Sequence, residues 1–368
     1  MSLTILASLM ITYAVVQTLV LLLLLRFVDP YEREPASLLA MMALWGAVGA
    51  TSISALGNTI LRNAIPADVA IVFGRALYAP VVEELAKGIA LVIFVIVTLR
   101  ANGRFGIPRF EGVTDGIVYG AAVGLGFAFT EDVVYLLIGA SQVGLEQGLV
   151  DYLARRDFFG VAMLHHALYT AAFGVGLGLA TWALHRRAKV LFGAVGLILA
   201  VLLHSFNNGW VQLTLVRRFG FDQALEYAQG AVGPRARRTM DEASLSASNV
   251  IDVADVVLLI AFVAAIAMWL AYQRRVLREQ LEEETATGLI SRTEWELLPR
   301  YWQRTLWYWQ LIRTGQWERL RLLRRIHNEL VNLALTKHRI ARGKGQESDA
   351  DRSRRIIVRL KAQKAAFI

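Results

Sequence analysis

Several runs of about twenty residues in this chain are almost entirely apolar, and these runs restrict the fold it can adopt. Residues 3–25 read LTILASLMITYAVVQTLVLLLLL, and residues 256–272 read VVLLIAFVAAIAMWLAY. A helix of about 20 apolar residues spans the roughly 30 Å hydrocarbon layer of a bilayer. Of the 368 residues, 56% are hydrophobic and 19% are charged, which is more apolar surface than a soluble domain of this length buries. The chain is therefore expected to be a polytopic integral membrane protein.

Hydropathy predicts an all-α bundle of about seven transmembrane helices, because a chain inside lipid must satisfy its backbone polar groups internally. The predicted spans are 3–25, 38–57, 77–99, 113–139, 158–184, 190–213 and 249–272, and 214–248 is expected to be a long loop. The loops on one side are the more basic, which predicts that this side is cytoplasmic, with the N-terminus outside and the C-terminus inside. Their basic residues are Arg26, Arg33, Arg100, Arg104, Arg109, Arg186, Arg187, Lys189, Arg274, Arg275 and Arg278.

The chain divides by composition into a transmembrane region, 1–272, and a basic tail, 273–368. From Gln273 onward lie 21 of the 39 Lys and Arg residues but only 11 of the 30 Asp and Glu residues. Tryptophan interleaved with arginine is typical of helices in the lipid headgroup layer, so we expect a basic amphipathic helical tail that contacts headgroups. A partner-binding tail is the alternative, and nucleic acid is not expected. The tryptophans are Trp295, Trp302, Trp307, Trp309 and Trp317.

Glycine recurs every fourth residue in the fourth span, at Gly116, Gly120 and Gly124, and the fifth span carries Gly174 and Gly178. This spacing strips side chains from one helix face and predicts close backbone packing.

Ionisable and polar residues interrupt four of the predicted spans. Each charge near mid-bilayer costs about 2.5 to 3.5 kcal/mol on insertion scales, so such residues indicate function unless they are paired. At a rise of about 1.5 Å per residue, the glutamates and histidines lie about 10 to 13 Å from the extracytoplasmic ends of their spans and can share one layer. The structural alternatives are an ion pair between Lys87 and one glutamate and histidines that only hydrogen-bond in the core. The residues are Glu83, Glu84, Lys87, Glu131, Asp132, His165, His166, His204 and Asn208.

At these residues the chain resembles the PrsW family of intramembrane proteases, relatives of the CAAX-processing membrane proteases. Five blocks in order carry the resemblance: DPYEREP at 29–35, APVVEELAKG at 79–88, DGIVYGAAVGLGFAFTED at 115–132, LHHALYTAAFGVGLG at 164–178 and LLHSFNN at 202–208. The family motif EExxK corresponds to residues 83–87, and its FxxxE motif corresponds to Phe127 and Glu131. Its single histidine in the fifth span corresponds to His166, so His165 has no counterpart in the family pattern. Asn208 and Asp132 depart from the aspartate and asparagine usual in the family.

The resemblance implies an intramembrane endopeptidase of a bacterial-type plasma membrane, with 1–272 as the protease-like domain. It further implies a single-pass membrane protein as substrate, of which an anti-sigma factor is one kind. A site near the extracytoplasmic face predicts cleavage on that side.

The polar residues of the four spans can supply the groups that peptide hydrolysis requires: a general base for water, a proton donor for the leaving amine and donors for the oxyanion. Glu83 or Glu84, with Glu83 favoured, would activate water while Lys87 holds the other glutamate. His166 and His204 would position the water, Asn208 would stabilise the oxyanion, and Glu131 would carry a proton. Alternatively, His166, His204 and Glu131 would bind a catalytic zinc ion. The cofactor is thus either none or zinc, and the sequence leaves both open.

The chain lacks the sequence signatures of other intramembrane protease classes. The chain has no cysteine and none of the motifs HExxH, GxGD or GxSG. The rivals from other classes are a proton-coupled transporter, since buried ionisable chains also relay protons, and a catalytically inactive relative that binds membrane segments. No repeat between the halves supports a transporter, and the intact glutamates disfavour an inactive relative.

Overall fold

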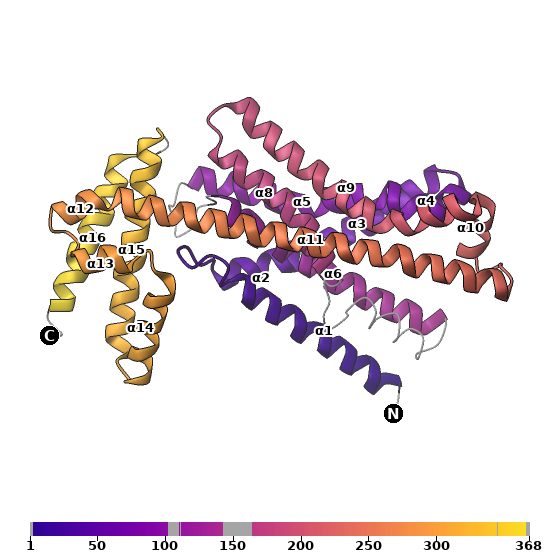
Figure 1. The fold of residues 1–368 in the computed structure, drawn as a ribbon, viewed down its shortest axis with the longest axis horizontal. Helices are drawn as coiled ribbons and strands as arrows, with labels where there is room; N and C mark the ends of the chain where they lie inside the picture. Colours follow the sequence, from indigo (N-terminus) through magenta and orange to yellow (C-terminus); the bar gives the residue numbers. More distant parts are fainter. Residues whose placement is uncertain (1–2, 102–109, 111, 143–163, 344, 366–368) are drawn as a thin grey trace. The chain divides into compact units, whose positions relative to one another are not determined.

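The computed structural model describes residues 3–101, 110, 112–142, 164–343 and 345–365, and this part of the chain is helical with no strand. It divides into a membrane unit, 1–28 and 34–266, and a C-terminal unit, 29–33 and 267–368 (Figure 1). The membrane unit contains α1 (Leu3–Leu25), α2 (Ala36–Leu44), the π-helix η1 (Trp45–Ala50), α3 (Thr51–Ala64), α4 (Ala67–Leu77), α5 (Ala79–Ala101), α6 (Val113–Gln142), α8 (His165–Trp182), α9 (Arg186–Phe219), α10 (Phe221–Ala228) and most of α11 (Pro234–Gln280).

Five helical segments of the described chain are long and apolar enough to cross a membrane: Ser8–Leu25, Ala36–Ala64, Val113–Leu137, Arg186–Phe219 and Pro234–Ala286. They coincide with the first, second, fourth, sixth and seventh predicted spans. The third and fifth predicted spans correspond to α5 and α8, which carry the charged and histidine residues of the site. Part of the fifth, 158–163, lies outside the described residues. The all-helical membrane fold is confirmed, and the count of seven stays a prediction.

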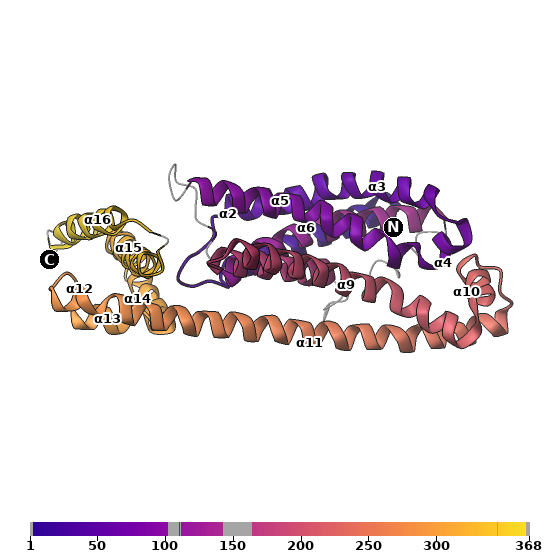
Figure 2. The ribbon, with the colours of Figure 1, turned by 90° about the horizontal axis from the view of Figure 1, so that it is seen from above.

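Helix α6 runs through the middle of the membrane unit, with α3 and α5 on one side and α8 and α9 on the other (Figure 2). Its glycines allow this position. A Cβ atom on Gly116 would lie 2.0 Å from the carbonyl oxygen of Gly174, and one on Gly124 would lie 2.2 Å from that of His166. On the opposite face, a Cβ on Gly126 would meet the Ala43 carbonyl at 1.8 Å. The predicted close packing of the fourth and fifth spans is therefore confirmed.

The segment expected to be a long loop, 214–248, is instead almost entirely helical. Helix α9 continues to Phe219, α10 follows, and α11 begins at Pro234. The turns occur where Gly220 and Gly230 adopt positive φ angles of 87° and 76°, a conformation that glycine tolerates at little cost. The expectation was wrong because these helices bury a small apolar cluster of their own, Leu215, Ala224, Met240 and Ala243.

The C-terminal unit is a small helical assembly with its own core. It contains the end of α11, then α12 (Glu282–Ala286), α13 (Arg292–Leu297), α14 (Tyr301–Arg313), α15 (Trp317–Ala341) and α16 (Glu347–Ala365). Residues 29–33 are part of it: the Tyr31 hydroxyl donates to the Pro299 carbonyl at 2.7 Å, and Arg304 donates to the Pro30 carbonyl at 3.0 Å. The Trp/Arg-rich region thus folds as several packed helices. The core comprises Tyr31, Leu277, Leu281, Ile326, Leu330, Leu333, Ala334 and Ile357, among others.

Candidate active site

The first turns of α5 carry the two adjacent glutamates, and both are buried. The Lys87 ammonium, whose side chain is fully buried, lies 2.7 Å from Glu84 Oε1 and 3.9 Å from Glu83 Oε2. Glu84 also accepts a hydrogen bond from the Thr170 hydroxyl at 3.0 Å. Glu83 accepts one from the Asn58 amide at 3.3 Å through Oε1, while its buried Oε2 has no hydrogen-bond donor among the residues that the structure describes. Lys87 therefore holds Glu84 closely, and Glu83 Oε2 has only longer charge contacts.

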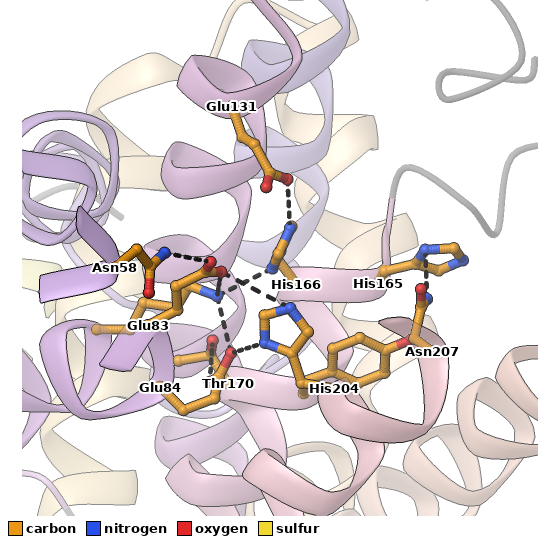
Figure 3. A network of polar contacts seen from close by, with 11 residues as sticks. Asn58, Glu83, Glu84, Glu131, His165, His166, Thr170, His204 and Asn207 are labelled. Atoms are coloured by element: carbon orange, nitrogen blue, oxygen red, sulfur yellow. Dashed lines mark hydrogen bonds and ion pairs between the residues drawn. The ribbon is translucent and has the colours of Figure 1, made fainter. Parts of the chain in front are cut away.

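His204, which is 1% exposed on α9, turns one ring nitrogen toward each of the two glutamates (Figure 3). Its Nδ1 is 3.0 Å from Glu84 Oε1, and its Nε2 is 3.7 Å from Glu83 Oε2. Since a carboxylate only accepts hydrogen bonds, Nδ1 carries a hydrogen toward Glu84, and Nε2 faces Glu83.

His166, in the first turn of α8, joins the same group from another direction. Its Nε2 is 2.8 Å from Glu131 Oε2, and its Nδ1 is 2.9 Å from the Lys87 ammonium. The Phe127 ring contacts both partners: its centroid is 5.0 Å from that of His166 and 3.9 Å from Lys87 Nζ. The imidazoles of His166 and His204 meet edge to face at 4.8 Å. Four helices thus bring seven sequence-predicted residues into one cluster: Glu83, Glu84, Lys87, Phe127, Glu131, His166 and His204.

A second polar cluster adjoins the first, and sequence reasoning missed most of it. Buried Asp255 of α11 accepts a hydrogen bond from the Tyr169 hydroxyl at 3.0 Å and lies 2.8 Å from His165 Nε2. The Asn207 amide contacts His165 Nδ1 at 2.8 Å and the Tyr169 hydroxyl at 2.7 Å. The Tyr169 ring stacks on His204 at 5.6 Å. An acidic residue within the apolar run of the last span was the signal that could have revealed Asp255.

His165 therefore belongs to the second cluster, and its place beside His166 in the sequence does not bring it to the glutamates. The amide expected next to the histidines was Asn208, whereas the contacts described above come from the neighbouring Asn207. Asn208 is half-buried on the same helix, and its proposed part at the oxyanion stays a prediction.

Residues 34–225 match the family described as PrsW family intramembrane metalloprotease. The chain belongs to this family. It is 27% identical over 197 residues to Protease PrsW of Geobacillus kaustophilus, which covers 54% of this chain and 76% of that protein. It is 29% identical over 126 residues to Protease PrsW of Halalkalibacterium halodurans, covering 34% and 48% respectively. No solved structure matches it. As a PrsW-family protein, the chain is a membrane-embedded peptidase. The match ends at residue 225, so Asp255 and the C-terminal helices α12 to α16 lie beyond it.

The PrsW family description implies a metal ion, and the donor atoms of this site fit one. In the described part of the chain, the group able to hold it is Glu83, His166 and His204, whose donor atoms lie within 4.8 Å of one another. Two histidines and a glutamate are the protein ligands of one well-known class of catalytic zinc sites. The carboxylate of this group is Glu83, where the sequence suggested Glu131.

The surroundings of the two imidazoles fit the same role. Glu84 binds one nitrogen of His204 and Glu131 binds one nitrogen of His166, so each ring is oriented by a carboxylate and has its other nitrogen toward the group. Carboxylates placed in this way are usual behind histidine metal ligands. The Lys87 ammonium already lies among these donors, so it would give up its contact with His166 Nδ1 to another cation.

Proposed function

We propose that the chain is an intramembrane endopeptidase that hydrolyses a peptide bond of a single-pass membrane protein, using Glu83, His166 and His204 to hold a divalent metal ion such as zinc. The observation that carries this proposal is the convergence of Glu83, His166 and His204, whose donor atoms lie within 4.8 Å of one another, with a carboxylate on one nitrogen of each imidazole. When bound, the ion would supply an activated water and polarise the scissile carbonyl.

The remaining residues have separable tasks in this proposal. Glu84 and Glu131 fix the orientation of His204 and His166, because a carboxylate on one ring nitrogen determines which nitrogen keeps its lone pair. The Glu131 side chain is 22% exposed, against 7% for Glu83 and 0% for Glu84. Glu131 is therefore the carboxylate that a substrate can approach, and it would take a proton from water and pass it to the leaving amine. Lys87 offsets the charge of Glu84 within the bilayer.

A second mechanism uses the same residues without a metal ion. Within the described part of the chain Glu83 Oε2 has no hydrogen-bond donor, and it lies 3.7 Å from His204 Nε2, so a water held between them would be activated by Glu83 as a general base. Both mechanisms require Glu83 and His204, but only one requires an ion.

The substrate is proposed to be a membrane-anchored protein because the site lies on helices of the membrane unit. An anti-sigma factor is one such substrate, as the sequence resemblance implies. A soluble peptide would have to reach residues that are nearly all buried.

The deciding experiment is cleavage of a panel of single-pass membrane proteins by the purified full-length protein in lipid, combined with measurement of its bound metal. We expect Glu83→Gln and His204→Ala to lose both cleavage and metal, and a chelator followed by zinc to abolish and restore cleavage. Glu131→Gln should keep its metal and lose at least about 100-fold in rate, the usual range for a removed acid or base.

Glu242→Gln is the matched control, because Glu242 is exposed on α11. Cleavage that survives complete metal removal but not Glu83→Gln would select the second mechanism. Full cleavage by Glu83→Gln and His204→Ala would refute both.

A further inference from the structure

Helix α14 of the C-terminal unit exposes a stripe of large apolar side chains to its surroundings. Trp302 is 72% exposed, Leu306 64% and Trp309 58%. Their spacing of four and then three residues puts them on one face of the helix. Trp317, at the start of α15, is 54% exposed as well. Large apolar side chains exposed side by side do not stabilise the unit itself, and such patches usually mark a surface that binds a protein or a membrane.

The opposite face of α14 is already occupied inside the unit, so the exposed stripe is separate from the core. Leu311 is buried with Leu320 and Leu323 of α15, and Trp307 packs against them. Arg304 is buried and donates to the Leu298 carbonyl at 3.1 Å. Of the tail tryptophans, Trp295 is also packed inside, with its indole donating to the Arg278 carbonyl at 3.1 Å. The structure thus separates internal tryptophans from exposed ones.

The charged residues of α14 itself are all basic. Residues 297–317 contain no Asp or Glu, while Arg300 and Arg313, at the two ends of α14, are exposed. Further exposed arginines follow on α15, at Arg319, Arg321, Arg324 and Arg325. An apolar aromatic stripe bordered by arginines is complementary to an anionic lipid surface, where rings enter the headgroup layer and guanidinium groups meet phosphates.

The position of this helix in the chain brings it to such a surface. The last apolar run ends at Tyr272, and α11 continues without interruption into the C-terminal unit. Within that unit, α14 runs across the direction of the last turns of α11 (Figure 1). Interfacial helices lie in the plane of the bilayer, and α14 begins fewer than 30 residues after the last apolar run ends.

We propose that α14 is a membrane-surface anchor whose Trp302, Leu306 and Trp309 enter the headgroup layer of an anionic bilayer, with Arg300 and Arg313 on the lipid phosphates. The anchor is specific to the α14 face and is independent of the peptidase chemistry proposed above. A zwitterionic surface would bind it less well because the arginines contribute most against anionic lipid.

The absence of cysteine from the chain permits a direct test. Leu306→Cys in the full-length protein, labelled with an environment-sensitive fluorophore, would be reconstituted in phosphatidylcholine vesicles with and without phosphatidylglycerol. A spin label on the lipid headgroup serves as quencher. Val358→Cys on α16 is the matched control, since Val358 is 56% exposed in the same unit. We expect quenching at position 306 to be several-fold stronger than at 358 with phosphatidylglycerol, and to weaken in high salt.

A second pair of variants tests the arginines. Arg300→Gln with Arg313→Gln should reduce the quenching at 306, while Arg355→Gln with Arg359→Gln, both exposed on α16, should not. Equal quenching at 306 and 358 would overturn the anchor. So would shielding of position 306 that depends on the protein-to-lipid ratio and not on phosphatidylglycerol, because that result would mean a second copy of the chain covers the stripe.

Discussion

Among single residues, Asp255 is expected to affect the rate of cleavage although it lies outside the Glu83 group. Its carboxylate contacts both Tyr169 and His165, and Tyr169 stacks on His204. Asp255 does not touch the Glu83 group, so we expect it to act by positioning Tyr169 against His204. Asp255→Asn keeps the size of the side chain but removes its charge, and should lower kcat by about 10-fold, as for residues behind a metal ligand, with little change in KM.

Steady-state kinetics in lipid with a cleaved substrate would measure this effect. Asp252→Asn is the control, because Asp252 lies one turn away on the same helix and is exposed. Asp255→Glu should recover part of the lost rate. A higher KM at unchanged kcat, or an equal effect of Asp252→Asn, would contradict a positioning role.

At the scale of helices, the glycines of α6 determine how closely α8 brings His166 to Glu131. A Cβ on Gly124 would lie 2.2 Å from the His166 carbonyl oxygen, whereas one on Gly193 of α9 would lie 3.7 Å from the Leu177 side chain, an ordinary contact. Gly124→Ala should therefore separate α6 from α8, destabilise the protein by about 1 to 3 kcal/mol and reduce cleavage. Gly193→Ala should leave both nearly unchanged, and thermal unfolding in detergent with a cleavage assay would compare them. Equal behaviour of the two variants would refute this reading of α6.

The same helices show what the sequence could and could not predict. Glycine spacing predicted the α6–α8 contact because only backbone approach requires it, and common depth predicted which polar residues would meet. The rotation of each helix about its axis depends on packing. The sequence therefore could not predict that Asn207, and not Asn208, contacts His165, or that His165 points away from Glu131. Helices within 214–248 escaped prediction because their apolar face is short and interrupted by charged residues.

For the whole molecule, the C-terminal unit is joined to the membrane unit at two places in the chain, through α11 and through residues 29–33. Tyr31 is 5% exposed, donates to the Pro299 carbonyl and accepts from Arg274 Nε at 3.1 Å. Tyr31→Phe should destabilise the C-terminal unit by about 1 kcal/mol, the usual worth of such a hydrogen bond. Hydrogen exchange of α15 amides would detect it, and Tyr13→Phe on α1 is the control. Unchanged exchange in α15 would mean that this segment does not stabilise the unit.

The C-terminal unit should also lose stability in mild acid through His338. This half-buried histidine of α15 has its Nε2 2.8 Å from the Tyr272 hydroxyl. Burial, and then the nearby Arg342, lowers the pKa of His338 below its ordinary value of 6.5. The unfolded chain therefore takes up the proton first, so this contribution to stability is complete above about pH 6.5 and is lost as the pH falls below it.

Hydrogen exchange localised to α15, at about pH 7.5 and about pH 5 and corrected for the intrinsic exchange rate, would measure the effect. The wild-type unit should open more readily at the lower pH. His338→Gln keeps a polar partner for Tyr272 and cannot be protonated, so its α15 should show a smaller loss of protection between the two pH values. If wild type and variant lose protection equally, the acid sensitivity of the unit comes from other groups, and His338 is not its source.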